Sequence, residues 1–177
     1  VGKSIIMDTR NIGSGQSVLA VQSGARLTLD GATVDGNGVV TGIAVKLGSE
    51  FTALSGQVIY GYPYGMTIGG TATIKDITID QTLHTGIYVE YGGKLDMTGG
   101  VVKHNVYGVA VASGASMTIS EEAKIVDAFG DLVSNFGTMT ITGGEYYDCY
   151  GRAIFNRGEM TIEGTAAENI KIHDVKN

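Results

Sequence analysis

Apolar and polar residues alternate with a period of two in short segments along this chain. Residues 87–91 and 95–97 are two such segments, and a glycine-bearing corner, TGG at residues 98–100, separates the second from a third that opens with Val101 and Val102. The segments are rich in Val, Ile, Thr and Tyr, which favour strands, and no window keeps apolar residues at helical spacing over three turns. The pattern therefore predicts an all-β chain whose strands are joined by glycine-rich corners.

These segments recur in a repeat of about 22 residues. The tripeptide Met-Thr-Ile begins at residues 117, 139 and 160, at spacings of 22 and 21, while a fourth copy at Met66 is out of phase with the other three. A unit of this length cannot bury its own apolar face, but units stacked in register bury one another. The sequence predicts a solenoid of about seven coils, and one glycine marks each coil: Gly24, Gly48, Gly69, Gly92, Gly114, Gly137 and Gly158.

Stacking places equivalent residues of successive coils in columns, and three columns are predicted to point inward. The first precedes the marker glycine and contains Val21, Val45, Met66, Val89, Val111, Ser134 and Phe155. The second follows the glycine and contains Leu27, Phe51, Ala72, Leu95, Met117, Met139 and Met160. The third lies two residues further on and contains Leu29, Ala53, Ile74, Met97, Ile119, Ile141 and Ile162. The position between the last two columns is predicted to face outward, so that Met-Thr-Ile runs in, out, in.

The repeated phrases GTMTITGG and RGEMTIEG, at residues 137–144 and 157–164, carry a resemblance to a known fold. They resemble coils of the right-handed parallel β-helix of the pectate lyase superfamily, and they are most similar in style to secreted, adhesin-like β-helix proteins of bacteria. The resemblance covers residues 17 to 175. It implies an extracellular or cell-surface location, but this fold carries lyases, hydrolases, phage tailspikes and inert stalks, so it does not by itself give the function.

Composition narrows the classes of partner. The length of 177 residues fits one domain, residues 1–177, and the first residue is Val1, which we expect of a piece excised from a longer extracellular protein with flanking domains. The net charge is −6 with basic residues scattered singly, which argues against a nucleic-acid partner. No stretch approaches the ~20 apolar residues of a membrane span. The one cysteine, Cys149, is expected to be a small buried residue.

A polysaccharide lyase or glycoside hydrolase is one interpretation of the acidic residues. The phrases NVYG, DAFG and DCYG align Asn105, Asp127 and Asp148 at one corner, where coils stacked ~4.8 Å apart make the carboxylates neighbours. Such a pair fits a retaining glycosidase, and His104 lies beside it. The same residues are also common at corners because they satisfy free backbone groups. The R-x-K, DD and G-H-G phrases that the resemblance implies for enzymes of the superfamily are absent.

Calcium is the cofactor to consider, and otherwise no cofactor is expected. The stretch DGATVDGNG places Asp30, Asp35 and Asn37 at the alternating spacing of calcium loops. It lacks the closing Glu of an EF-hand, and a plain glycine-rich corner explains the same residues.

Tyrosine placement favours a binding surface. The candidate residues for a ligand are Tyr60, Tyr62, Tyr64, Tyr88, Tyr107 and Tyr150. The residue before the closing glycine of five coils is predicted to form a ladder along one edge: Tyr64, Thr85, Tyr107, Phe129 and Tyr150. Tyrosines on an outer face suit stacking on sugar rings or on a protein partner, although they also stiffen sheets by stacking on one another.

We therefore favour a non-catalytic extracellular module with a structural or adhesive role. Its expected partner is a polysaccharide or cell-surface glycan that binds along the tyrosine-lined side. A polysaccharide lyase or hydrolase that uses Asp127, Asp148 and His104 is the alternative.

The predicted register can be tested with two neighbouring substitutions. Met139→Asp is expected to lower the melting temperature more than Thr140→Asp, because burial of a Met side chain contributes ~1.5–3 kcal/mol and Thr140 faces outward. Thermal unfolding of both variants, followed by circular dichroism, measures the difference. If Met139→Asp melts no lower than Thr140→Asp, the register is wrong.

Overall fold

The computed structural model of the protein describes residues 3–6, 16–164 and 170–176. The single domain predicted for residues 1–177 thus includes residues 1–2, 7–15, 165–169 and 177, which lie outside the described residues. The described residues form strands and connections, with no helix among them. The strands belong to three parallel sheets, named A, B and C below.

Each sheet takes one strand from every coil. Sheet A contains β1 (Lys3–Ile6), β4 (Ala32–Asp35), β7 (Gly56–Ile59), β10 (Thr78–Asp80), β13 (Val101–Lys103), β16 (Lys124–Ala128), β19 (Glu145–Cys149) and β22 (Lys171–Val175). Sheet B contains β2 (Ser17–Val21), β5 (Thr41–Val45), β8 (Tyr64–Ile68), β11 (Thr85–Val89), β14 (Tyr107–Val111), β17 (Val133–Asn135) and β20 (Ile154–Asn156). Sheet C contains β3 (Arg26–Leu29), β6 (Glu50–Ala53), β9 (Thr71–Ile74), β12 (Lys94–Met97), β15 (Ser116–Ile119), β18 (Thr138–Ile141) and β21 (Glu159–Ile162).

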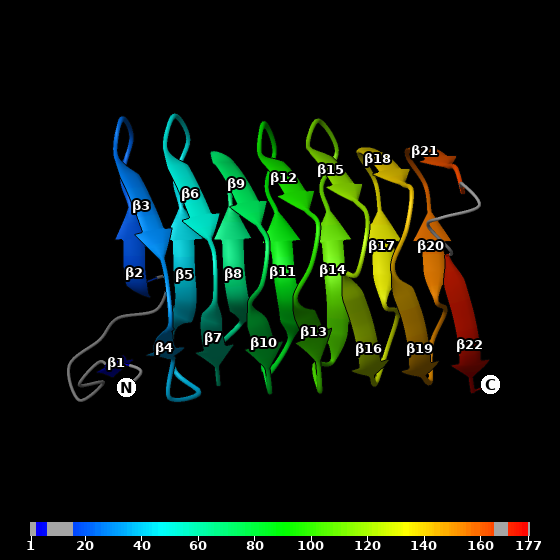
Figure 1. Ribbon diagram of the computed structural model, residues 1–177, viewed down its shortest axis with the longest axis horizontal. Coiled ribbons are helices and arrows are strands. Elements are labelled where there is room, and N and C mark those ends of the chain that lie inside the picture. The colour runs from blue at the N-terminus through cyan, green and yellow to red at the C-terminus, as the bar shows by residue number, and fades with distance from the viewer. Residues whose placement is uncertain (1–2, 7–15, 165–169, 177) are drawn as a thin grey trace.

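The chain runs from sheet B to sheet C to sheet A in each coil and then rises to the next coil. Figure 1 shows the coils side by side along the long axis, with the two ends of the chain at opposite ends of the molecule. Seven coils follow one another from β2 to β22, while β1 pairs with β4 ahead of them. The predicted fold, an all-β right-handed parallel β-helix of about seven coils of ~22 residues, is confirmed.

The Met-Thr-Ile register is also confirmed. Met139 pairs with its counterparts in the coils before and after it, and Ile141 does the same. Met139 and Ile141 are buried, whereas Thr140 between them is half-buried on the outer side. In β21, the edge strand of sheet C, Ile162 is 52 % exposed because no further strand covers it on that side.

The predicted column before the marker glycine is wrong in three coils. Pairing gives the column Val21, Val45, Ile68, Val89, Val111, Asn135 and Asn156, so Met66, Ser134 and Phe155 do not belong to it. The cause is the corner between sheets B and C. It holds four residues in coils 1, 2, 4 and 5, but two in coils 3, 6 and 7. Counting back a fixed distance from the glycine therefore reaches the wrong strand position.

In two of the three short corners, those of coils 6 and 7, asparagine ends this column. Asn135 is fully buried, and its amide nitrogen donates to the Asn156 side-chain oxygen and to the Glu159 carbonyl, both at 2.8 Å. The Asn135 side-chain oxygen accepts from the Gly137 N–H at 3.1 Å, and Asn156 accepts in the same way from Gly158. A tight corner leaves backbone groups without ladder partners, and these side chains satisfy them.

Glycines allow sheet B to approach sheet A closely where the two sheets meet. A Cβ atom on any of four glycines would lie 2.3–2.6 Å from a side-chain carbon of a sheet A strand. These glycines occupy one position in coils 2 to 5, namely Gly42, Gly65, Gly86 and Gly108, and the carbons belong to Val58, Ile79, Val102 and Ile125. The corner between sheets A and B is therefore closely packed from the inside.

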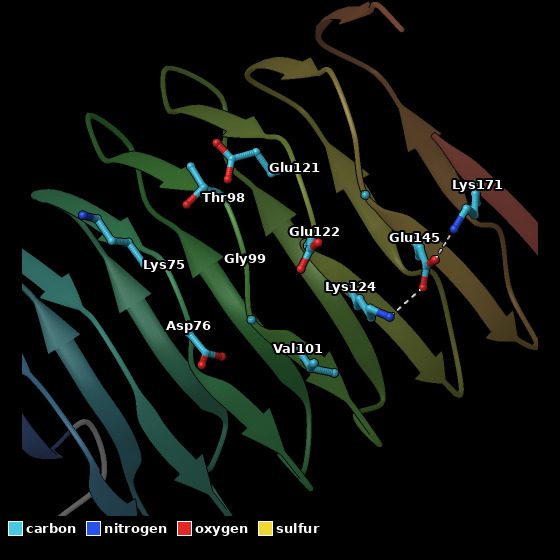
Figure 2. Close-up of a pocket in the computed structure, with 12 residues that line it drawn as sticks. Lys75, Asp76, Thr98, Gly99, Val101, Glu121, Glu122, Lys124, Glu145 and Lys171 are labelled. Carbon is cyan, nitrogen blue, oxygen red and sulfur yellow. Dashed lines mark hydrogen bonds and ion pairs between the residues drawn. The ribbon is translucent and has the colours of Figure 1, made fainter. Parts of the chain in front are cut away.

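A ladder of ion pairs joins the last three strands of sheet A. Lys124, Glu145 and Lys171 are register partners on β16, β19 and β22. Figure 2 shows the Glu145 carboxylate between the two lysines, at 2.8 Å from Lys124 Nζ and 2.6 Å from Lys171 Nζ. Hydrogen bonds from Lys124 and then Lys171 lower the pKa of Glu145 from 4.5 to about 2. The ladder thus attaches β22, whose side chains are exposed, to the rest of the sheet.

This ladder predicts a specific loss of stability in acid. The folded-state pKa of Glu145 lies below its unfolded value, so its contribution is complete above pH 4.5 and is lost as the pH falls toward 2. Exposed pairs contribute at most about 1 kcal/mol, so the effect is small. Glu145→Gln is expected to lose stability at neutral pH and to show a shallower decline between pH 4.5 and 2 in urea unfolding.

Glu121→Gln is the control, because Glu121 is an exposed glutamate of the same coil as Lys124 that has no place in the ladder. Equal pH dependence in Glu145→Gln and the wild-type protein would contradict the stabilising role of the ladder.

Candidate functional site

The corner from sheet A to sheet B carries one residue per coil in the left-handed backbone conformation. From coil 2 onward its φ angle lies between 50° and 55°, at Tyr60, Gln81, His104, Asp127, Asp148 and Asp174. Asn, Asp and His are the side chains that tolerate this conformation best after glycine. The acidic corner therefore has a backbone cause, and the structure brings His104 into the same column as Asp127 and Asp148.

The predicted position of Asn105 in this column is wrong. Asn105 pairs with Ala128, one residue beyond Asp127, and its side chain is buried. Coil 5 has one more residue than coil 4 between this pair and the next one, Val109 with Val133. The phrases NVYG and DAFG are alike in letters but are displaced by one residue in space.

Two residues after the first five of these left-handed residues, an apolar side chain lies on the outer side of the corner, whereas Lys176 follows Asp174. This set, here called the corner row, contains Tyr62, Leu83, Val106, Phe129 and Tyr150. Phe129 is 74 % and Tyr150 is 63 % exposed, and their ring centroids are 5.8 Å apart. The row follows the helix axis over five successive coils.

A groove of about 580 Å³ lies along this corner, here called the corner groove. Its apolar side is formed by Tyr60, Leu83, Val106, Phe129 and Tyr150, and its polar side includes Gln81, His104 and Asp127. The volume is within the range of small-ligand sites, and apolar area with a few polar groups is the usual composition of such sites.

A chain of polar contacts fixes the polar side of the groove. His104 Nδ1 lies 2.7 Å from Asp80 Oδ1, and His104 Nε2 lies 3.1 Å from Asp127 Oδ2. Lys103 Nζ lies 3.6 Å from the other Asp80 oxygen. Asp148, one coil beyond Asp127, has Lys176 Nζ at 3.4 Å. Both ring nitrogens of His104 thus face carboxylates, which orients the ring, and within the described residues no contact uses Asp127 Oδ1.

The six candidate tyrosines divide into two groups. Tyr60, Tyr62 and Tyr150 lie at the corner just described. The other three are Tyr64, Tyr88 and Tyr107, on strands β8, β11 and β14 of sheet B. They form an aromatic cluster with His84, here called the tyrosine cluster.

The rings of the tyrosine cluster pack face to face, edge to face and at a tilt. Tyr64 stacks on Tyr88 with centroids 5.1 Å apart, and His84 lies 5.3 Å from Tyr107. Burial, followed by the charges of Tyr88 and Glu90, raises the pKa of Tyr64. Because these rings pack on one another, they leave less surface available to a ligand than the rings of the corner row do.

The predicted aromatic ladder is correct in its first three members only. Tyr64, Thr85 and Tyr107 are register partners. Phe129 and Tyr150 belong instead to the corner row, because coils 5 and 6 carry the additional corner residue.

The remaining predicted residues lie elsewhere. Asp35 is the last residue of β4 and Asp30 lies two residues before its first residue, so the length of the strand, ~3.3 Å per residue, lies between them. Asp30 accepts a hydrogen bond from Ser55, and Asp35 accepts one from the Asn37 N–H. The structure does not bring these residues together, and calcium binding stays a prediction. Cys149 is buried, as expected, and burial raises the pKa of its thiol.

A larger groove of about 920 Å³ lies between sheets C and A (Figure 2). Its ionisable lining residues are Lys75, Asp76, Glu121, Glu122, Lys124, Glu145 and Lys171, and it has no aromatic lining residue. Two of its three lysines are paired with Glu145. We place the candidate site in the corner groove because apolar and polar groups converge there.

Two buried polar side chains, Thr82 and Asn105, lie behind the corner groove. The Thr82 N–H donates to Asn105 Oδ1 at 2.8 Å. Thr82 Oγ1 and Asn105 Nδ2 have no hydrogen-bond partner among the described residues. Asn105 was named from the sequence but Thr82 was not, and Leu83, Val106 and Gln81 in the groove were missed, because the prediction followed acidic and aromatic residues.

Comparison with known proteins gives one match. A family model described as a right handed beta helix region matches residues 2–125. No curated protein and no solved structure matches the chain. In the part of the chain that the structure describes, no helix is long and apolar enough to cross a membrane.

Thr82→Val is expected to raise the urea midpoint of unfolding. The substitution replaces the Thr82 hydroxyl, which is buried and lacks a hydrogen-bond partner among the described residues, with a methyl group. A buried hydroxyl without a partner costs about 1–3 kcal/mol of folding free energy, and the substitution removes this cost. Thr85→Val is the matched control, because the Thr85 hydroxyl contacts His84 Nδ1 at 2.9 Å and its loss should destabilise the fold. A lower midpoint for Thr82→Val than for the wild-type protein would contradict this account of the Thr82 hydroxyl.

Proposed function

The chain belongs to the right handed beta helix family, and from that premise we propose that it is a non-catalytic module that binds glycans through its aromatic corner. We further propose that it serves a structural or adhesive role in a secreted or cell-surface protein of bacteria, joined to flanking domains. The fold itself is compatible with many functions, so the proposal depends on the corner.

The corner row is the observation that carries the proposal. Four of its five side chains, Tyr62, Leu83, Phe129 and Tyr150, are large and exposed, and Val106 between them is half-buried, at positions where solubility alone favours polar residues. Flat rings and aliphatic side chains in a line suit the C–H faces of sugar rings, and the tyrosine hydroxyls offer polar contacts at the edge.

Backbone hydrogen bonds hold the corners of the row in place before any ligand arrives. The Tyr62 N–H donates to the Val40 carbonyl at 2.9 Å, and the Phe129 N–H donates to the Asn105 carbonyl at 3.1 Å. Each corner is therefore bonded to the corner of a neighbouring coil. A preformed surface loses little conformational entropy when it binds, which favours recognition of a long, repetitive ligand.

The polar side of the groove supports a glycan over a purely apolar ligand. Gln81 and Asp127 lie beside the row and can accept hydrogen bonds from sugar hydroxyls. The extracellular or cell-surface location is supported by the resemblance to secreted β-helix proteins and by the stiffness of the solenoid.

A polysaccharide lyase or glycoside hydrolase is the second candidate. It is favoured by the adjacent positions of Asp127 and Asp148 on stacked coils, and by the contact of His104 with Asp127. Retaining glycosidases use carboxyl groups ~5–5.5 Å apart, close to the strand spacing of ~4.8 Å. However, the contacts with His104 and Lys176 occupy oxygens of both carboxylates.

Affinity gel electrophoresis against a panel of neutral and acidic polysaccharides, with calcium and with chelator, tests the proposal. Retardation by at least one polysaccharide is expected. Phe129→Ala and Tyr150→Ala should each weaken it by roughly two- to tenfold, since one aromatic contact contributes ~0.5–1.5 kcal/mol.

Thr118→Ala, on the outer side of sheet C, is the control and should bind as the wild-type protein does. A reducing-end assay on the same samples should detect no new ends. New ends would favour the hydrolase, and an absence of retardation by every polysaccharide would contradict glycan binding.

A further inference from the structure

The charges around the corner groove define the class of glycan. We infer that the groove takes neutral glycans and rejects polyuronates, an inference that rests on the proposed glycan-binding function. The argument uses the groove's ionisable residues, their partners and the left-handed column beside the row.

No lysine or arginine is among the residues that line the groove. Two lysines beside the groove are each paired with a carboxylate. Lys103 lies 3.6 Å from Asp80, and Lys176 lies 3.4 Å from Asp148. Recognition of a sugar carboxylate ordinarily uses the planar fork of an arginine or the ammonium group of a lysine. Within the described residues, the groove offers neither as an available partner.

The left-handed column adds repulsion to this lack of attraction. Asp127, Asp148 and Asp174 follow one another on stacked coils, with ~4.8 Å between strands. Together with Asp80 these carboxylates outnumber the two lysines paired with them, Lys103 and Lys176, so the corner keeps an excess of negative charge. A polyuronate carries one negative charge per sugar, so a chain that lies along the corner row brings like charges close to this column. At such distances one like-charge contact weakens binding roughly fivefold even in water.

The same column attracts a neutral glycan. Asp127 Oδ2 is engaged by His104, while no contact within the described residues uses Oδ1, which can therefore accept from a sugar hydroxyl. A carboxylate acceptor gives a stronger bond than a neutral oxygen does. The corner row from Tyr62 to Tyr150 spans four coil steps, roughly 19 Å, which is long enough for several sugar units.

The test compares two matched pairs of substitutions in the full chain. Asp127→Asn with Asp148→Asn removes two charges at the groove, and asparagine tolerates the left-handed conformation. Asp30→Asn with Asp96→Asn removes two charges elsewhere and controls for net charge. The probes are galactomannan and β-glucan as neutral polysaccharides, and polygalacturonate and alginate as polyuronates, in affinity electrophoresis at low salt.

The wild-type protein should be retarded by a neutral probe and not by the polyuronates. The groove pair should gain retardation by polyuronates of at least threefold over the control pair, and its gain should shrink as salt is added. Phe129→Ala should weaken neutral binding, whereas Tyr88→Ala, in the tyrosine cluster, should leave it within twofold.

Three outcomes would overturn the inference. Retardation of the wild-type protein by polyuronates but not by neutral probes would leave glycan binding intact and show that its class is wrong. Loss of neutral binding in Tyr88→Ala but not in Phe129→Ala would move the site to the tyrosine cluster. No retardation by any probe would contradict the proposed function and this inference together.

Discussion

Every coil of this protein must place its three strands over those of the coil before it, ~4.8 Å away and in register. Because the side-chain period in a strand is two, a shift by one residue would turn a buried column outward. The columns of Met, Ile and Val inside the solenoid hold that register, as the pairing of Met117 with Met139 and of Ile119 with Ile141 shows. Insertions and deletions are therefore confined to the corners.

The candidate site follows from this constraint. At the corner from sheet A to sheet B the chain leaves the strand through one left-handed residue, and the residue two places later must face solvent. Stacking converts that local geometry into two parallel lines, one polar and acidic, the other apolar. Asp127 and Phe129 show the arrangement in a single coil. The same corner geometry recurs in successive coils, and together these corners form a surface long enough for a polymer.

Much of the fold could be predicted from the sequence, because the alternation of apolar and polar residues two to five positions after the marker glycine identifies the inward positions of sheet C in every coil. The column through Leu95, Met117 and Met139 was predicted correctly for this reason. Positions on the far side of a corner could not be predicted, since corner lengths differ by one or two residues and no letter in the sequence marks the change. The prediction placed Asn105 in the left-handed column, from which it lies one residue away, and placed Phe129 in the aromatic ladder, although it belongs to the corner row. The site was therefore predicted only in part.

Backbone NMR of the ¹⁵N-labelled chain, titrated with cellohexaose, mannohexaose and N-acetylchitohexaose, tests the central claim that the corner row is a glycan-binding surface. The account predicts that at least one of these neutral oligosaccharides shifts amide signals at residues 60–62, 81–84, 104–107, 127–130 and 148–150, while the outer face of sheet C is unaffected. Shifts centred on sheet C or on the larger groove between sheets C and A would contradict it, and so would the absence of shifts with all three oligosaccharides.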